Sequence, residues 1–186
     1  SLKILFIYNE SPLEGKGNID LFSVTKKLES KGHKTIMILM SDEQSPIQDN
    51  IHTILPAPIT GFLTIPLILK KLLKIIKNEK PDIILSEAGW YFPVLLKLLS
   101  FFNKIPYVFN FRGLVLEDIV EWKIHSIHIR LIANLFVKIN NKLYRKNKHI
   151  IGTNYALCKY YEEILGISVP LIGTHSIDLN TYKPIS

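Results

Sequence analysis

Short, almost purely apolar runs alternate along this 186-residue chain with stretches whose apolar residues recur at helical spacing. The runs lie at 2–8, 33–40, 51–55, 81–86, 106–111 and 149–154, with a last one at 169–172. A strand that is apolar throughout is buried on both faces, which is typical of a parallel sheet between helices. The alternation therefore predicts an α/β fold: a mostly parallel sheet of six or seven strands with helices on both faces and strand 2–8 in a central position.

Helices are expected at 63–79, 90–103, 117–146 and 155–165, and a further one starts at Asn18, which can cap it. In the helix 63–79 the lysines gather on one side and the leucines and isoleucines on the other. In the long helix 117–146, one face is formed by Ile124, Leu131, Leu135 and Ile139.

Composition excludes several classes of protein. Because 47% of the residues are hydrophobic, the chain can build a core and is not a disordered protein. The single cysteine, Cys158, excludes a disulfide framework and a cysteine-cluster zinc site, and it favours a reducing compartment. Lysines interrupt the apolar runs before the roughly 18 residues that a membrane span needs, and no signal peptide is visible. We therefore expect a cytoplasmic protein.

The net charge of +7 is concentrated in one segment. Residues 122–161 carry eight lysines and arginines and no acidic residue. Such a segment attracts anions, for example lipid headgroups, pyrophosphates or nucleic acid. The alternative is a solvated, lysine-rich helix face, which is equally common. Nucleic acid ranks below the membrane surface because no recognised nucleic-acid module is present.

In a parallel sheet the carboxyl ends of the strands share one edge, and ligands bind there. The first candidate site at this edge is the loop with Gly15, Gly17 and Asn18, which leads into a helix whose free N–H groups favour an anion. The loop has neither the dinucleotide fingerprint nor the P-loop pattern. Its alternative is a plain flexible loop.

Three other strand ends carry candidate binding residues. Glu87 can bind sugar hydroxyls, or it can stabilise the start of the next helix. Arg112 suits a phosphate or carboxylate and Gly113 lets the backbone approach a ligand, unless the arginine pairs with an acidic residue of the next helix. Asn154 follows the strand 149–154. The six histidines show no metal-ligand spacing and no G-x-S-x-G elbow is present, so we predict neither a metal site nor a serine nucleophile.

Seven segments, in this order, resemble the amino-terminal domain of retaining glycosyltransferases of family 4. They are a strand (3–7), a glycine loop (15–18), a helix end with Gly-His (28–35), a Lys-Pro-Asp-Ile-Ile strand (80–84), an Ile-Pro-Tyr-Val strand with Arg-Gly (105–113), a strand before a helix (149–154) and an Ile-Asp-Leu segment ending in Lys-Pro (176–184). Each piece is short, and their order and spacing carry the resemblance, which extends over the whole chain. Arg112 stands where the family usually has histidine, and His175-Ser176 stands where it has Asn-Gly.

The resemblance implies a GT-B enzyme made of two Rossmann-like domains, in which residues 1–186 form the acceptor-side domain and a donor-binding domain would follow. Its partners would be a nucleotide-sugar donor and a glycan or lipid-linked acceptor, most commonly in surface polysaccharide or glycolipid synthesis. No cofactor and no protein nucleophile is implied. The Gly15–Gly17 loop would lie near the donor phosphates or the acceptor, and Glu87 and Arg112 would line the acceptor side.

Two other readings remain open at this level. One is a noncatalytic Rossmann-like domain that binds an anionic sugar or lipid. The other, an enzyme with a nucleotide cofactor, is disfavoured because the fingerprint is missing. We also expect peripheral association with the inner face of an anionic membrane, through the segment 122–161 and the helix 63–79.

Overall fold

A computed structural model of the chain describes residues 1–8, 19–40, 50–54, 65–87, 91–111, 127–147 and 149–172. The strands are β1 (Lys3–Tyr8), β2 (Lys34–Met40), β3 (Ile51–Ile54), β4 (Ile83–Glu87), β5 (Tyr107–Phe111) and β6 (Ile150–Gly152). The helices are α1 (Ile19–Ser30), α2 (Ile65–Glu79), α3 (Phe92–Asn103), α5 (Ile127–Lys146) and α6 (Tyr155–Leu165). The predicted alternation of strands and helices is confirmed for the described elements, apart from the last predicted strand, and most of their ends shift by no more than two residues.

The six strands form one parallel sheet in the order β3-β2-β1-β4-β5-β6. From β1 the sheet extends through β2 to β3 on one side. Strand β4 lies on the other side of β1, and β5 and β6 follow it outward. The predicted central place of strand 2–8 is confirmed. This reversal of strand order between β1 and β4 is the point at which open α/β sheets bind their ligands, outside the carboxyl ends of the strands.

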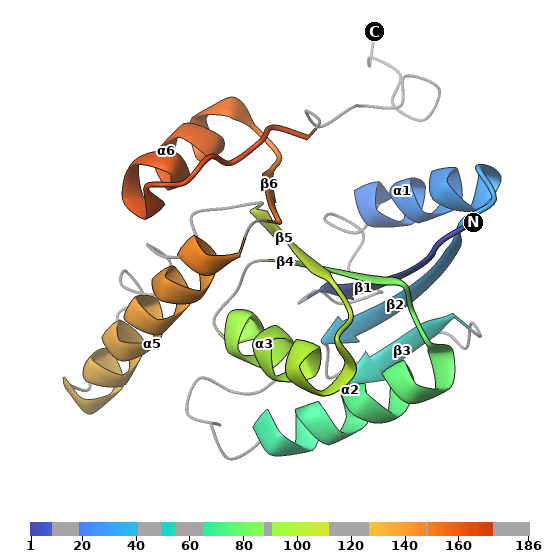
Figure 1. Cartoon of the computed structure of the whole chain (residues 1–186), viewed down its shortest axis with the longest axis horizontal. Coiled ribbons are helices and arrows are strands. Elements are labelled where there is room, and N and C mark those ends of the chain that lie inside the picture. Colours follow the sequence, from blue (N-terminus) through green and yellow to red (C-terminus); the bar gives the residue numbers. More distant parts are fainter. Residues whose placement is uncertain are drawn as a thin grey trace, which may run out of the picture.

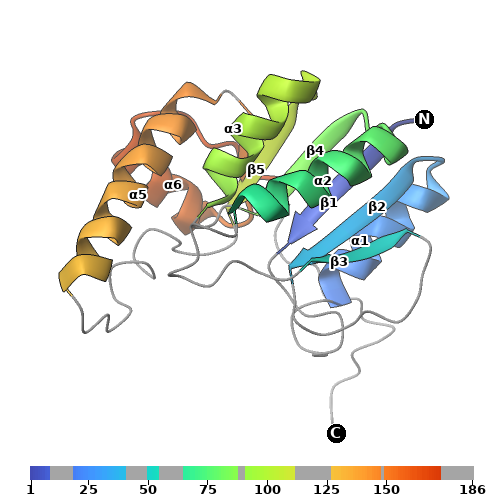
Figure 2. The same ribbon diagram turned by 90° about the horizontal axis from the view of Figure 1, so that it is seen from below.

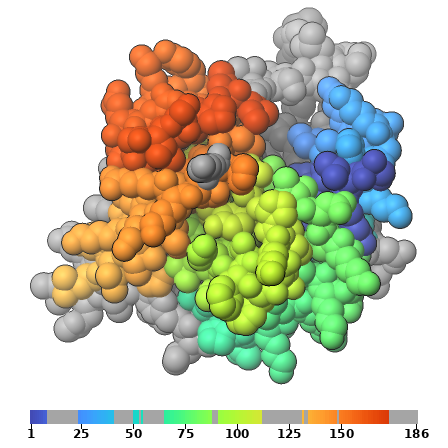
Figure 3. Space-filling model, in the orientation of Figure 1, coloured from blue at the N-terminus to red at the C-terminus, as the bar shows by residue number. Residues whose placement is uncertain are grey.

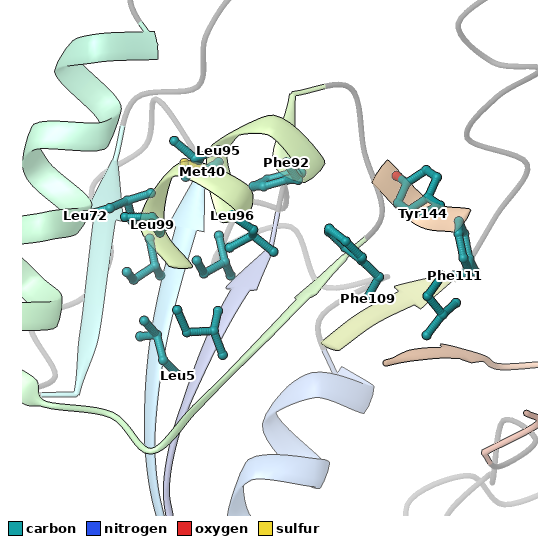
Figure 4. Packing of buried hydrophobic residues seen from close by; sticks show 14 of the residues in the cluster. Leu5, Met40, Leu72, Phe92, Leu95, Leu96, Leu99, Phe109, Phe111 and Tyr144 are labelled. Carbon is teal, nitrogen blue, oxygen red and sulfur yellow. The ribbon is translucent and has the colours of Figure 1, made fainter. Parts of the chain in front are cut away.

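Helices cover both faces of the sheet (Figures 1 and 2). Alternate residues of a strand point to opposite faces: Phe6 and Tyr8 of β1 form a small core cluster against which Leu28 of α1 packs, whereas Leu5 and Ile7 join the larger core with α2, α3 and α5. Figure 4 shows the leucines of α2 and α3 above β1 at one end of that larger core and an aromatic group at the other.

Helix α2 packs as its sequence predicts. Ile68, Leu72 and Ile76 are buried, while the lysines at 70, 71, 74 and 77 are exposed. The apolar face of α2 therefore packs on the core, and its lysines lie in solvent.

Helix α5 does not bury the apolar face that its sequence shows. The face with Leu131 and Leu135 is turned outward, and these side chains are 63% and 56% exposed. The buried stripe instead contains Asn140 and Tyr144, both fully buried. The reason is that the Tyr144 ring fits between Phe109 and Phe111 of β5, with ring centroids 5.0 Å from each. The part of the predicted helix before residue 127 lies outside the described residues.

The predicted last strand at 169–172 is not a strand. A single parallel bridge joins Leu171 to Gly152, with hydrogen bonds from the Gly152 N–H to the Pro170 carbonyl (3.1 Å) and from the Ile172 N–H to the Gly152 carbonyl (3.0 Å). Because Pro170 has no N–H to donate, pairing does not extend further back along this segment. None of the described helices is long and apolar enough to cross a membrane.

Candidate functional site at the carboxyl edge of the sheet

Glu87 is the last residue of β4, next to the reversal point of the sheet. Its neighbour Ser86 is fully buried, and the Ser86 hydroxyl donates a hydrogen bond to the Glu87 carbonyl oxygen (3.0 Å). Because alternate residues face opposite sides, Glu87 lies on the same face as Leu85, which packs against the α1-side core cluster. The carboxylate of Glu87 is thus placed on the α1 face at the ligand edge, and it is half-buried.

Asn110 of β5 is the register partner of Glu87. Its neighbours Phe109 and Phe111 point into the larger core, so the Asn110 side chain points to the face on which Glu87 lies. The Asn110 Oδ1 atom is buried and makes no hydrogen bond. A buried amide oxygen without a partner costs free energy unless a donor reaches it. The Glu87 carboxylate and the unpartnered amide oxygen of Asn110 therefore lie at the ends of neighbouring strands, on the same face of the sheet.

Asn154 follows β6 and starts α6. Its extended backbone (φ −143°, ψ 158°) and its Oδ1 atom, which accepts a hydrogen bond from the Leu157 N–H at 2.8 Å, make it the N-cap of the helix. The side-chain oxygen is therefore committed to the helix end. The Asn154 amide nitrogen makes no hydrogen bond with a described residue and can still donate to a ligand.

The ends of β5 and β6 are joined beyond the regular ladder. The Thr153 N–H and hydroxyl both donate to the Phe111 carbonyl, each at 3.3 Å. Gly152, just before, must lack a side chain, because a Cβ atom there would lie 2.5 Å from the Sγ of Cys158 in α6. This close approach brings the start of α6 against the carboxyl edge.

Two of the predicted site residues, Glu87 and Asn154, thus lie at the same edge of the sheet, on strands separated by β5. The other five, Gly15, Gly17, Asn18, Arg112 and Gly113, lie outside the described residues. Sequence analysis did not single out Asn110 as a binding residue. The sequence did contain a signal, because Asn110 is a polar residue in an otherwise apolar strand. The register of the sheet places it on the same face as Glu87.

The titratable groups near β6 do not suggest nucleophilic chemistry. Burial, and to a lesser degree the nearby Glu162 carboxylate, raises the pKa of the Cys158 thiol, so it stays protonated at neutral pH. Burial also raises the pKa of Tyr144 well above its ordinary value. Within the described ranges, no three side chains of the His, Cys, Asp and Glu types gather as a metal site would need.

The fold has close counterparts among solved structures. The Anabaena protein HepE, crystallised with UDP and glucose, is 18% identical, with a TM-score of 0.61 over 98% of this chain and 46% of that one. The lipopolysaccharide outer core galactosyltransferase WaaB is 12% identical, with a TM-score of 0.59 over 90% and 43%. The UDP-N-acetylglucosamine 2-epimerase of Rickettsia bellii is 18% identical, with a TM-score of 0.56 over 93% and 44%.

These likenesses show the fold: a Rossmann-like α/β domain of the kind that GT-B enzymes contain. The chain spans less than half the length of each of these proteins. Among curated proteins, none matches the chain significantly in sequence.

The sequence of residues 21–172 matches the family described as Glycosyltransferase Family 4. That match covers every described strand after β1 and every described helix after the first turns of α1. The match therefore extends over most of the chain and does not rest on one short motif. The chain belongs to glycosyltransferase family 4.

Proposed function

We propose that this chain is the amino-terminal, acceptor-side domain of a two-domain glycosyltransferase, which transfers a sugar from a nucleoside diphosphate to an acceptor with retention of configuration. The family match over residues 21–172 carries the proposal. The parallel sheet supports it, because its strand order reverses beside Glu87, where such folds bind ligands.

In this proposal the carboxyl edge holds the acceptor. The Glu87 carboxylate accepts hydrogen bonds from sugar hydroxyls, and the unpartnered Asn110 Oδ1 accepts another. The Asn154 amide nitrogen donates to an acceptor oxygen across β5. The chain's own contribution to the reaction is therefore to bind and orient the acceptor and to exclude water, without a covalent enzyme intermediate.

The donor would be a nucleotide sugar, with a uridine nucleotide as the first to test, because the HepE structure contains UDP and glucose. A lipid-linked or glycan acceptor of a surface polysaccharide or glycolipid fits the lipopolysaccharide galactosyltransferase among the structural neighbours. A second domain would supply most of the contacts that bind the nucleotide. The 186-residue chain alone should therefore bind UDP weakly and transfer no sugar, because the diphosphate would be left in water.

We further propose that the domain associates with the inner, anionic face of a membrane through α5. The outward stripe of Leu131, Leu135 and Ile139 is exposed, and the exposed cations Lys138 and Lys142 lie one turn apart beside it. Exposed apolar residues flanked by cations match an anionic lipid surface, to which each cation adds about 1 kcal/mol. The exposed lysines of α2 add further positive charge.

The test uses the protein expressed from its complete gene. It is incubated with UDP- and GDP-sugars and a lipid extract, and nucleoside diphosphate release and a labelled product are measured. Glu87→Gln should lower kcat/KM for the acceptor about tenfold or more, since a hydrogen bond to a charged group is lost. The matched control is Glu79→Gln, because Glu79 pairs with Lys3 (2.8 Å) at the opposite, amino edge and should leave kcat/KM unchanged.

Two outcomes would overturn the proposal. No release of nucleoside diphosphate from any sugar nucleotide would leave a noncatalytic binding domain. Conversion of a UDP-sugar into its epimer without transfer would place the protein with the 2-epimerases, whose fold it shares.

A further inference from the structure

The amino edge of the sheet, opposite the candidate acceptor site, carries a cavity of about 260 Å³ between the ends of α3 and α5. The residues that directly precede β5 and β6 form part of its lining. Figure 3 shows α3, in yellow-green, beside the end of α5 and the residues that follow it, in orange. The described lining includes seven side chains that can donate a hydrogen bond or carry positive charge: Lys97, Ser100, Lys104, Tyr107, Lys146, Asn147 and His149.

None of the described residues that line this cavity is an aspartate or glutamate. Neither α3 nor α5 contains an aspartate or glutamate, and no described acidic group lies within ion-pair distance of the three lysines, since the salt bridge found in the described part joins Lys3 to Glu79. A concave surface with cations and without acids concentrates anions. Here three exposed lysines, Lys97 and Lys104 of α3 and its end and Lys146 of α5, line one cavity.

Five donor side chains of the cavity make no hydrogen bond within the described part of the chain. The Ser100 and Tyr107 hydroxyls and the three lysine ammonium groups make no hydrogen bond to any described residue, whereas Asn147 is occupied in bracing the backbone of His149, with its Oδ1 accepting from the His149 N–H at 3.1 Å. Burial raises the pKa of Tyr107, so its hydroxyl keeps the proton and can donate it in a hydrogen bond.

Lys104 lines the cavity at the end of α3, and its backbone conformation is shared by Lys80 (φ 48°), which follows α2 and does not line the cavity. Lys104 ends α3 with a left-handed backbone (φ 55°, ψ 20°), and its N–H donates to the Ser100 carbonyl at 2.8 Å. Glycine or asparagine is the usual residue at such a helix end, because a side chain disfavours this conformation. The chain instead places a lysine there, at the rim of the cavity.

We infer that this amino-edge cavity binds a phosphate group. Lysine ammonium groups bind phosphate as point charges, and three lysines line this cavity together with two hydroxyl groups that can donate hydrogen bonds. The apolar part of the lining, formed by Ile105, Pro106 and Leu143, would contact what the phosphate is attached to. The ligand is thus a phosphomonoester, borne either by a lipid headgroup or by a small soluble molecule.

The positive surface continues beyond the cavity. A second hollow of about 480 Å³ shares Lys146 and is lined by Lys138, Asn141, Lys142 and Arg145 of α5. All of its lysines and Arg145 are exposed, and Arg145 also donates a hydrogen bond to the Ile164 carbonyl (3.1 Å). This second hollow would raise the local concentration of an anionic ligand near the phosphate cavity.

The inference is independent of sugar transfer, because the cavity and the candidate acceptor site lie at opposite edges of the sheet. Binding is measured directly, since cations at helix ends also stabilise helices and a change in stability alone would not report a ligand. Inorganic phosphate is titrated into the ¹⁵N-labelled 186-residue chain, and amide shifts are followed. We expect the amides of Ser100, Lys104, Asn147 and His149 to shift together with one dissociation constant.

The variant is Lys97→Gln/Lys146→Gln, and the matched control is Lys26→Gln/Lys27→Gln, which removes the same charge from exposed positions of α1 on the other face. The first variant should weaken phosphate binding about tenfold or more and the control less than twofold, because charge-assisted hydrogen bonds are lost only in the first. Equal weakening by both variants, or shifts spread evenly over all lysine-rich surfaces, would overturn the inference.

A second arm separates the two sources of phosphate. Co-sedimentation is compared for phosphatidylcholine vesicles with and without phosphatidic acid, whose headgroup is a phosphomonoester. If the Lys97→Gln/Lys146→Gln variant loses the dependence on phosphatidic acid and the control keeps it, the ligand is a lipid headgroup. If the variant loses phosphate binding but keeps vesicle binding, the ligand is a soluble phosphomonoester. If neither measurement depends on Lys97 and Lys146, no phosphate site exists in this cavity.

Discussion

Helices α2 and α5 lie on the same face of the sheet and are both amphipathic, yet they use their apolar residues in opposite ways. In α2 the leucine and isoleucine face is buried and the lysines are in solvent. In α5 a stripe with Leu131 and Leu135 is exposed, while Asn140 and Tyr144 are buried. The comparison teaches that an apolar stripe in the sequence of a helix does not by itself show whether the protein's own core covers that face.

The largest effects should come from the two buried anchors. Leu72→Ala in α2 should lower the free energy of unfolding by about 2–5 kcal/mol and Tyr144→Ala in α5 by about 3–5 kcal/mol, because both side chains are fully buried. Urea unfolding followed by circular dichroism measures both. If Tyr144→Ala cost less than about 1 kcal/mol, the aromatic contacts with β5 would not be what holds α5.

The exposed stripe should respond in the opposite way. Leu131→Gln/Leu135→Gln should change stability by less than about 0.5 kcal/mol for each exposed position, because these side chains are 63% and 56% exposed. The same variant should weaken partitioning into anionic vesicles about tenfold, since two apolar side chains no longer enter the interface. Co-sedimentation at low and high salt measures this loss.

The control for the stripe is Lys26→Gln/Lys27→Gln on the other face of the sheet, which should reduce vesicle binding far less. Wild-type binding that ignores both anionic lipid content and salt would contradict the membrane proposal, whatever the leucine variant does.

A smaller effect is expected from the Tyr144 hydroxyl. Its oxygen is buried and makes no hydrogen bond, so Tyr144→Phe removes a polar group that folding desolvates without compensation. We expect the free energy of unfolding to stay the same or to rise by up to about 1 kcal/mol. A loss of more than about 1 kcal/mol in thermal or urea unfolding would show that the hydroxyl has a partner.

The smallest effect concerns alkaline pH. Burial, and then the neighbouring Tyr161, raise the pKa of Tyr144 well above 10.0. In the unfolded chain the phenol loses its proton near its ordinary pKa of about 10, so the folded state binds more protons above that pH. Stability is therefore complete below about pH 10 and falls as the pH rises further. Tyr144→Phe should show a shallower fall than the wild type in urea unfolding from about pH 9 to 11. If the wild type and Tyr144→Phe lost stability equally over this pH range, the prediction would be wrong.

The sequence by itself determined the sheet and its order of elements. Strand β1 is apolar on both faces, and such a strand is stable only between two helix layers, so its central place follows from composition. The end of α6 follows similarly from Gly166, whose left-handed backbone (φ 65°) closes the helix. The site was predicted only as far as an edge: Glu87 was identified because it follows a strand, whereas Asn110 was not, since its role depends on the register that sets it opposite Glu87.

Only the tertiary structure decided which face of α5 is covered and what gathers at the amino edge. The helix has apolar residues on more than one side, so its sequence admits two packings, and the aromatic side chains of β5 select the one that buries Tyr144. The cavity at the amino edge joins two separate segments of the chain, residues 97–107 at the end of α3 and the start of β5, and residues 143–149 at the end of α5 and before β6. The hydrophobic periodicity of one segment predicts which of its faces are apolar. Which distant segments come together depends on the packing of the whole sheet.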